Sequence, residues 1–364
     1  MRFYESLLYI MEKILFIHTK LSGGGAEKVI MNIYNSIDDT NFQKKYISLC
    51  DNINTEEFCG LGATSVVKSW LKLQKFIKEY NPDMVFSTMI HVALLINILR
   101  IFNNFGFIHI TRMAASVTNP FVSYYDRIIR WSFVKTIRKN ELIICQTQQM
   151  QKMFMLNYGI KKQNLLVVRN FLDTETIDQL KDQFEVVGKD KKFKIISLGR
   201  IDRIKGFEYG IKALKELYTQ GFDFDYHIYG DIVHKDYYQH LKDLIVACGL
   251  ENNVFLCGKV DNPYPYLKGA DLLLLPSLSE GFPNVVIESL YLGVPVVTTD
   301  CSDFHGIIEE GVNGYIVPTK TIKPLSDAIK KGMQLPKNSF TFRYRNYDYN
   351  SFFKEIINSS KERI

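Results

Sequence analysis

The chain lacks paired cysteines, low-complexity tracts and internal repeats. None of its six cysteines belongs to a Cys-x-x-Cys pair, so neither a zinc site nor a disulfide framework is indicated. Buried free thiols in a reducing compartment fit this cysteine usage better. With 46% hydrophobic and 23% charged residues, the composition is that of an ordinary globular protein.

No secretory signal or membrane-spanning segment is evident. Residues 1–10 are apolar but have no proper cleavage site. The apolar stretch 93–110 contains Arg100, Asn103 and Asn104, which argue against a membrane span. The first strand pattern starts just after Met11, so Met1 and Met11 both remain candidate starts, and we expect a cytoplasmic protein.

Negative charge is scarce in the first half of the chain. Residues 1–170 hold 21 Lys and Arg but 12 Asp and Glu, whereas residues 171–364 hold 24 and 27. The positive first half favours an acidic partner, such as a nucleic acid, a membrane surface or a phosphorylated acceptor. Basic, aromatic helices expected near residues 68–78 and 124–139 suit the surface of an anionic membrane. Each alone is better explained as an ordinary amphipathic helix whose aromatic face lies in the core.

Apolar strand patterns alternate with helix patterns of period near 3.6 along both halves. This alternation predicts the α/β class, with parallel sheets covered by helices on both faces. The chain is long enough for two such domains, which we place at 1–170 and 171–346. A C-terminal helix within 347–364 follows and is expected to cross back to the first domain. The polar stretch 172–192 suits a linker or an irregular surface segment.

Two glutamates, Glu280 and Glu288, flank the loop and helix start that follow a buried strand pattern at 271–275. Asn284 is placed to cap the helix, so Glu280 lies just before its start and Glu288 about one turn inside it. Free N–H groups at a helix start attract phosphate, and carboxylates accept hydrogen bonds from sugar hydroxyls. A nucleotide-sugar has both of these groups, although two glutamates at this spacing are also common on solvated helices.

Cations and glycines follow other strand patterns of the second half. Gly199-Arg200 closes the first of these strands, and Lys205-Gly206 precedes the next helix. At the carboxyl end of a strand, Arg and Lys can hold a diphosphate. Gly230 and Gly258 supply further turns at strand ends. In the first half, Gly23-Gly24-Gly25 lets backbone approach a pyrophosphate, but it is not the Gly-x-Gly-x-x-Gly of nicotinamide-binding proteins.

Together these motifs resemble the retaining glycosyltransferases of family 4. The resemblance spans nearly the whole chain and implies the GT-B fold, in which two Rossmann-like domains with parallel sheets face across a cleft. The first would be the acceptor-side domain and the second the nucleotide-sugar-binding domain. The Pro276-Ser277 and Glu280 to Glu288 block is its most specific part, and the glycine loop its least specific.

The resemblance assigns roles residue by residue. Arg200 and Lys205 would hold the donor diphosphate and stabilise the leaving group, and Glu280 would lie near the donor sugar. Residues of the donor site would be Gly24, Gly25, Gly230, Lys259, Val260, Gly281, Phe282, Pro283, Asn284, Val285 and Glu288. No metal and no cofactor would be needed, because cationic side chains and a helix start stabilise the departing charge. The donor would be linked to UDP or GDP.

The acceptor side is less determined. The family implies a sugar acceptor, and analogy extends this to a polyprenyl-diphosphate-linked glycan at the inner face of a membrane, as in surface-polysaccharide assembly. Many relatives have a histidine where Arg112 stands here, so Arg112 and His91 are our acceptor-side candidates. His109 lies within a strand pattern and is better explained as a hydrogen-bonded core residue. Asp223-Phe-Asp225 precedes a strand, which argues against a metal site.

Other functions remain open at this stage. A nucleotide-sugar epimerase or hydrolase of the same fold would act on the donor without an acceptor. A phosphorylase would be longer and have a pyridoxal-phosphate lysine that we cannot place. A nucleic-acid-binding module would use the basic half, but no recognition motif is present and the second half is acidic. An intact donor motif argues against an inactive scaffold.

Overall fold

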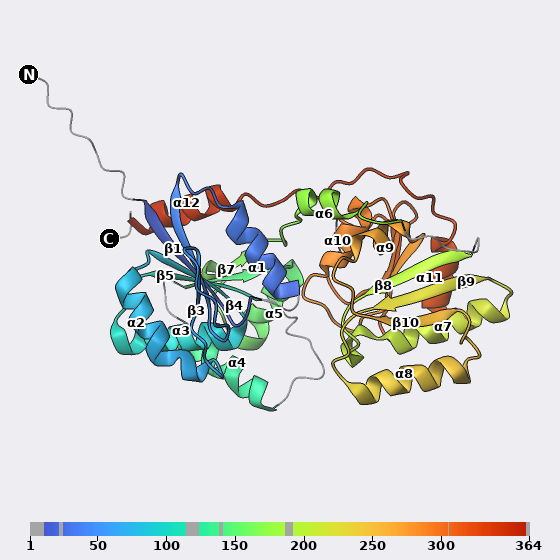
Figure 1. Ribbon diagram of the computed structural model, residues 1–364, viewed down its shortest axis with the longest axis horizontal. Helices are drawn as coiled ribbons and strands as arrows, with labels where there is room; N and C mark the ends of the chain where they lie inside the picture. Colours follow the sequence, from blue (N-terminus) through green and yellow to red (C-terminus); the bar gives the residue numbers. More distant parts are fainter. Residues whose placement is uncertain are drawn as a thin grey trace, which may run out of the picture. The chain divides into compact units, whose positions relative to one another are not determined.

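The computed structural model describes residues 11–21, 25–113, 124–137, 141–185, 192–304 and 306–361. These residues form two compact units. The N-terminal unit holds the described residues up to Phe171 together with those from Tyr347 onward, and the C-terminal unit holds those from Leu172 to Asn346. In each unit helices cover both faces of a sheet (Figure 1).

The sheet of the N-terminal unit has seven parallel strands in the order β3-β2-β1-β4-β5-β6-β7. Its central strands are buried on both faces, which explains their nearly continuous apolar sequences. The strands are β1 (Glu12–His18), β2 (Phe42–Ser48), β3 (Phe58–Gly60), β4 (Met84–Thr88), β5 (Ile108–Arg112), β6 (Glu141–Cys145) and β7 (Leu165–Val167).

Two apolar cores fill the N-terminal unit, one on each face of its sheet. The helices α1 and α12 contribute to one core, and α2 and α3 contribute to the other. Phe353 of α12 is fully buried beside Phe16 and Phe86, so the end of the chain completes the core of this unit. The helices are α1 (Gly25–Ser36), α2 (Trp70–Tyr80), α3 (Ile90–Asn103), α4 (Tyr124–Thr136), α5 (Gln148–Tyr158) and α12 (Tyr349–Lys361).

The sheet of the C-terminal unit has six parallel strands in the order β10-β9-β8-β11-β12-β13. In β9, buried Phe224, Tyr226 and Ile228 alternate with partly exposed residues, as expected where one face is covered more completely. The strands are β8 (Phe193–Leu198), β9 (Phe224–Tyr229), β10 (Val254–Gly258), β11 (Leu272–Leu275), β12 (Val296–Thr299) and β13 (Gly314–Val317).

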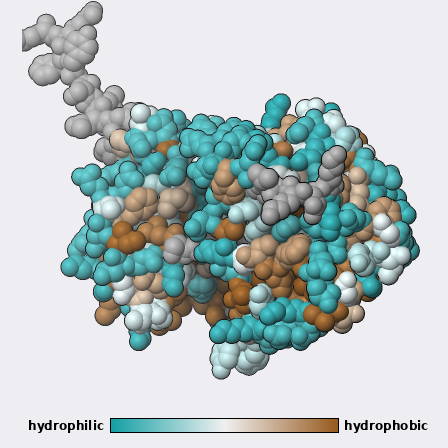
Figure 2. Space-filling view, turned by 45° about the vertical axis from the view of Figure 1, so that its right-hand side comes forward, coloured by the Kyte–Doolittle hydropathy of each residue, from teal (hydrophilic) through white to brown (hydrophobic). Residues whose placement is uncertain are grey.

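Helices on both faces enclose this second sheet. One core lies under α7, α8 and α11, and the other under α6, α9 and α10, where aromatic residues of the segment after α11 also pack. The helices are α6 (Thr174–Leu180), α7 (Phe207–Thr219), α8 (Lys235–Ala247), α9 (Tyr264–Gly269), α10 (Asn284–Tyr291) and α11 (Lys323–Gly332). The face seen in Figure 2 is mostly hydrophilic with separate apolar patches, so much of the apolar content lies in these cores.

The two sheets share one topology over six strands, and this topology determines where ligands are expected. In each, the chain runs outward from the first strand over two strands and then returns to the other side of the first strand. Such a reversal leaves a crevice at the carboxyl ends of the two strands that flank it. The reversal lies between β1 and β4 in the N-terminal unit and between β8 and β11 in the C-terminal unit.

The predicted fold class is confirmed: two α/β units with parallel sheets. Two local expectations were wrong. The stretch 172–192 is not simply an irregular linker, because Asp173 caps a helix there, α6, by accepting a hydrogen bond from the Thr176 N–H at 3.0 Å. Cys257 is exposed, although its strand is apolar; Cys145 and Cys301 are buried free thiols as expected.

Candidate functional site

Lys205 is held at the carboxyl end of β8 by a short turn. The Asp202 carboxylate accepts a hydrogen bond from the Ile204 N–H at 3.2 Å and starts a 3₁₀ turn over Arg203–Lys205. Gly206 ends the turn with φ = +61°, in the left-handed region that glycine favours. The Lys205 side chain then lies over Gly199, where an added Cβ would come within 3.2 Å of its Cε. Glycine at 199 therefore makes room for this lysine.

Gly230 allows the ends of three neighbouring strands to come together. A Cβ at position 230 would overlap the carbonyl oxygen of Gly199. The Gly230 N–H donates to the carbonyl of Gly258 at 2.8 Å, and the Gly199 N–H donates to Tyr229 at 2.9 Å. Gly230 thus acts through packing at the strand ends rather than through a side chain.

Glu280 meets Lys205 at this place. Its Oε1 lies 2.6 Å from the Lys205 Nζ and accepts a second hydrogen bond, also of 2.6 Å, from the Ser277 hydroxyl. Both charged side chains are mostly buried, with 16% of Lys205 and 14% of Glu280 exposed. A buried ion pair with a further hydrogen bond is a defined geometry rather than a mobile surface contact.

The loop that carries Glu280 is fixed on two sides. On one side, the Leu278 N–H donates to the Ile204 carbonyl at 2.7 Å, and a Cβ at Gly206 would overlap the carbonyl oxygen of Pro276. On the other side, the Glu280 N–H donates to the Cys301 carbonyl at 2.9 Å. Burial, with the Glu280 charge as a smaller cause, raises the pKa of the Cys301 thiol to about 12, so this thiol stays neutral.

The helix after the loop starts one residue earlier than expected. Asn284 is the first residue of α10, and Pro283 occupies the capping position without a side-chain hydrogen bond, so the prediction that Asn284 caps the helix was wrong. Proline has no side-chain acceptor, which leaves N–H groups of the first turn without that type of cap. Gly281, Phe282 and Pro283 are buried, and Asn284 and Val285 are partly exposed.

Glu288 lies on α10 and is partly exposed. Its Oε1 accepts a hydrogen bond of 3.4 Å from the hydroxyl of Tyr264, which belongs to α9. Glu288 therefore has a different partner from Glu280, although both glutamates belong to the same sequence block. This separation suits two carboxylates that bind different parts of one ligand.

The remaining donor-site candidates of the C-terminal unit are more open to solvent. Arg200 is exposed, immediately after Gly199. Lys259 is exposed too and forms an ion pair of 3.5 Å with Asp231, while Val260 is partly exposed. The structure thus brings Lys205, Glu280 and the glycines together and places Arg200 and Lys259 on nearby strand-end loops without a described contact to that pair.

In the N-terminal unit, histidine and threonine side chains lie near the point where the strand order reverses between β1 and β4. Gly24 lies outside the described residues, and Gly25 is the first residue of α1. His91, near the start of α3, has its Nε2 3.3 Å from the Thr19 hydroxyl. Met89 precedes α3 with φ = +68°, an uncommon conformation for a residue with a side chain.

Sequence reasoning missed His18. It is the last residue of β1 and is fully buried, with Nε2 3.1 Å from a carboxylate oxygen of Glu27 and Nδ1 hydrogen-bonded to Thr88. In the sequence, a single histidine in an apolar run resembles a core residue. Only its position at the end of the first strand could have indicated a functional residue.

Arg112 and His109 are both core residues of β5. Arg112 is 1% exposed and donates to the side-chain oxygen of Asn170, so its role toward an acceptor stays a prediction. His109 is fully buried; its Nδ1 donates to Asn97 at 2.8 Å and its Nε2 accepts from Ser87 at 2.9 Å. Burial lowers the pKa of His109, with Glu141 opposing, which confirms the expectation of a hydrogen-bonded core histidine.

The structure also bears on the questions of a metal ion and of a membrane-spanning helix. Asp223 and Asp225 pair with Lys192, at 3.3 and 3.7 Å. Within the described ranges, no group of three or more His, Cys, Asp or Glu is arranged to hold a metal, and no helix combines the length and apolarity that crossing a membrane requires.

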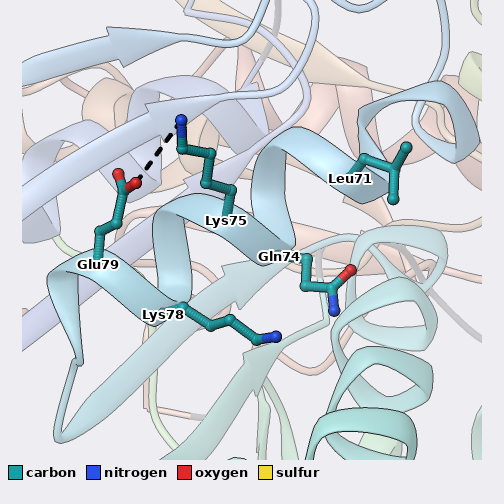
Figure 3. A pocket seen from close by; sticks show the side chains of 5 residues that line it. All are labelled: Leu71, Gln74, Lys75, Lys78 and Glu79. Carbon is teal, nitrogen blue, oxygen red and sulfur yellow. Dashed lines mark ion pairs between the residues drawn. The ribbon is translucent and has the colours of Figure 1, made fainter.

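A hollow on α2 is not part of the candidate site. Its lining side chains all come from one helix, as Figure 3 shows: Leu71, Gln74, Lys75, Lys78 and Glu79. Lys75 and Glu79 pair across it at 3.7 Å and are mostly exposed. The hollow therefore lacks the converging polar groups of a binding pocket.

Comparison with known sequences adds to this picture. Residues 178–349 match the family of group 1 glycosyl transferases. An uncharacterised glycosyltransferase of Methanocaldococcus jannaschii is 32% identical over 252 residues, covering 65% of this chain and 60% of that protein. The N-acetylgalactosamine-N,N'-diacetylbacillosaminyl-diphospho-undecaprenol 4-alpha-N-acetylgalactosaminyltransferase of Campylobacter jejuni is 28% identical over 312 residues, which are 80% of this chain and 81% of that enzyme.

Among solved structures, the chain is similar to HepE of Anabaena in complex with UDP and glucose. The TM-score is 0.75 at 20% identity, and the match covers 96% of this chain and 100% of HepE. At this identity the similarity establishes the fold, which is the GT-B fold of two parallel-sheet domains.

Proposed function

We propose that the chain is a glycosyltransferase of surface-polysaccharide biosynthesis. It would transfer a sugar from a nucleotide-sugar to a glycan or a lipid-linked sugar acceptor, with retention of the anomeric configuration and without a metal ion. The observation that carries the proposal is the meeting of Lys205 and Glu280 at the reversal point of the C-terminal sheet.

This arrangement fits the two ends of a sugar diphosphate. The Lys205 ammonium would face the diphosphate, and Glu280 would accept hydrogen bonds from sugar hydroxyls. The two side chains neutralise each other at 2.6 Å, so neither charge is buried alone. In the complex with the donor, the diphosphate would neutralise part of the Lys205 charge, and sugar hydroxyls would donate hydrogen bonds to Glu280.

The reaction breaks the bond between the anomeric carbon and the diphosphate oxygen. The electron pair leaves on the nucleoside diphosphate, and an acceptor hydroxyl forms the new bond to the anomeric carbon while its proton passes to the departing diphosphate. Negative charge therefore grows on the diphosphate in the transition state. Lys205 would stabilise that charge together with Arg200, which follows Gly199 at the end of the same strand. This electrostatic stabilisation is the largest catalytic effect expected here.

The comparisons support a uridine nucleotide as donor and a lipid-linked acceptor. HepE was solved with UDP and glucose, and the name of the Campylobacter enzyme specifies a diphospho-undecaprenol acceptor. Metal independence is supported by the Lys205 ammonium, because a cation at this site would offset part of the diphosphate charge that a divalent ion offsets in other enzymes. Retention is supported only by the resemblance of the sequence motifs to those of family 4.

The test is transfer from a panel of UDP- and GDP-sugars to polyprenyl-diphosphate-linked sugars in the presence of a chelator. We expect a glycosylated lipid whose new bond has the anomeric configuration of the donor, as determined by NMR. Lys205→Met should abolish the product. The matched control is Lys330→Met, because Lys330 belongs to α11 and lies over Phe222, next to the amino end of β9.

Other outcomes would identify other functions. Donor turnover without an acceptor would indicate an epimerase or a hydrolase instead of a transferase. Salt-sensitive binding of nucleic acid, with no response to nucleotide-sugars, would favour the nucleic-acid-binding alternative. Equal activity of Lys205→Met and Lys330→Met would contradict the role of Lys205.

A further inference from the structure

The helix α4 of the N-terminal unit has an apolar face turned outward. Tyr124 is 74% exposed, Tyr125 is 76%, Ile128 is 44% and Trp131 is 62%. Phe133 is fully buried on the opposite side. An ordinary surface helix places its aromatic face in the core and its polar face in water, so α4 departs from that pattern.

The exposed residues form one continuous stripe with cations beside it. Tyr124, Ile128, Trp131 and Lys135 follow one another at helical spacings of four, three and four residues, which puts them on one side of the helix. Arg127 is exposed next to this stripe, and the Lys135 ammonium lies 5.8 Å from the centre of the Trp131 ring.

Contacts on the opposite side of α4 fix the orientation of the stripe. The Asn97 side chain of α3 donates to the Thr136 hydroxyl at 3.3 Å, at the last residue of α4. Phe133, with no exposed surface, anchors the same turn. Rotating the helix to bury Trp131 would expose Phe133 and break this hydrogen bond, so the outward face belongs to the fold of the unit.

We propose that α4 docks on an anionic phospholipid bilayer, with Tyr124, Tyr125, Ile128 and Trp131 entering the headgroup layer and Arg127 and Lys135 contacting lipid phosphates. Tyrosine and tryptophan combine an apolar ring with a polar tip, which suits the interface between headgroups and acyl chains. The cations match a negative lipid surface, in keeping with the excess of Lys and Arg in residues 1–170.

This inference concerns a surface and not the proposed chemistry. Docking is measured on the full chain without donor or acceptor, so its failure would leave the glycosyltransferase proposal intact. Conversely, an inactive protein that still binds vesicles would leave the docking inference intact. Docking would bring the enzyme to a lipid-linked acceptor if the proposed function holds.

The first experiment is co-sedimentation with phosphatidylcholine vesicles with and without phosphatidylglycerol. The full chain should bind the anionic vesicles, and the triple variant Tyr124→Ser, Tyr125→Ser and Trp131→Ser should bind at least about tenfold more weakly. Arg127→Gln should weaken binding about fivefold and reduce its sensitivity to salt. The matched control is Leu156→Ser on α5, since Leu156 is 83% exposed in the same unit.

A second experiment observes α4 directly. Trp70 and Trp131 are the only tryptophans of the chain, so Trp70→Phe leaves Trp131 as the single tryptophan reporter. Its emission should shift to shorter wavelength with anionic vesicles, and brominated lipids should quench it.

Three outcomes would overturn the inference. Unchanged Trp131 emission with vesicles would show that this face stays in water. Vesicle binding equal in the triple variant and in Leu156→Ser would place the docking surface elsewhere. An emission shift that depends on protein concentration, without lipid, would show that a second protein copy covers the stripe instead.

Discussion

The six strands of the C-terminal sheet follow the same order as the first six strands of the N-terminal sheet, but the two units differ in the chemistry at the point where that order reverses. In the C-terminal unit the reversal holds an ion pair, Lys205 with Glu280 at 2.6 Å. In the N-terminal unit the corresponding place holds a histidine and a threonine, His91 with Thr19 at 3.3 Å. The topology thus determines where side chains come together at the strand ends. The identity of those side chains determines which class of ligand the place can bind.

The backbones at the two reversals differ as well. Gly206 and Gly230 permit approaches in the C-terminal unit that any side chain would block. In the N-terminal unit, Met89 adopts a positive φ with a side chain present. Gly206 and Gly230 therefore let the strand-end loops of the C-terminal unit pack against each other, which positions the loops that carry Lys205 and Glu280.

The largest expected effect is on sugar transfer, and it compares a charged residue at one reversal of the strand order with a histidine at the other. Lys205→Met should lower kcat/KM for sugar transfer by about 100- to 1,000-fold, because a charge on the leaving diphosphate would lose its nearest cation. His91→Gln should lower it by about tenfold or less, because the glutamine amide can still form a hydrogen bond with the Thr19 hydroxyl. Steady-state kinetics of both variants would check this ranking, and a reversed order would contradict the assignment of the donor diphosphate to the C-terminal unit.

The next effect tests the glycine packing. Gly230→Ala should destabilise the C-terminal unit by about 1–3 kcal/mol, because its Cβ overlaps the Gly199 carbonyl oxygen. Gly106→Ala is the control, since an added Cβ there meets nothing within 4 Å. Thermal unfolding of both variants would measure the difference, and equal midpoints would show that the strand ends can adjust.

A smaller effect is expected for Glu280, whose role in the ion pair differs from that of Lys205. Glu280→Gln should lower transfer about tenfold by weakening hydrogen bonds to the sugar. The affinity for UDP alone should stay equal or increase, because Lys205 would no longer be paired with a carboxylate. Calorimetric titration with UDP would measure this, and a loss of UDP affinity as large as the loss of transfer would place Glu280 against the nucleotide instead.

The smallest effect belongs to the N-terminal unit and its buried histidine. The pKa of folded His109 is lowered by burial, so the unfolded chain takes up a proton that the folded chain does not. Stability is therefore complete above about pH 6.5 and decreases as pH falls below it, by at most about 1.4 kcal/mol per pH unit. His109→Gln should flatten this decrease in unfolding experiments at several pH values. An unchanged slope would show that His109 titrates alike in both states.

The sequence predicted the sheets well because their strands are buried on both faces and have apolar runs such as Leu272–Leu275. It also indicated Lys205 and Glu280 as site residues. It could not show that they form an ion pair, because 75 residues separate them and only the strand order brings them together. The roles of these residues in binding and catalysis stay predictions.

Other features depend on contacts that a sequence pattern does not contain. The periodicity of α4 indicates two faces but not which one meets the core, and Phe133 rather than Trp131 is buried. His18 becomes recognisable only when its contacts with Glu27 and Thr88 are known. Asn284 is a good capping residue, yet Pro283 occupies that position.

The most direct test of the account is hydrogen–deuterium exchange of the metal-free protein with and without UDP. We predict slower exchange at residues 199–206 and 276–288, where the backbone around Lys205 and Glu280 would close on the diphosphate. The start of α3 around His91 should change less. Protection confined to the N-terminal unit, or no protection anywhere at saturating UDP, would contradict the central claim.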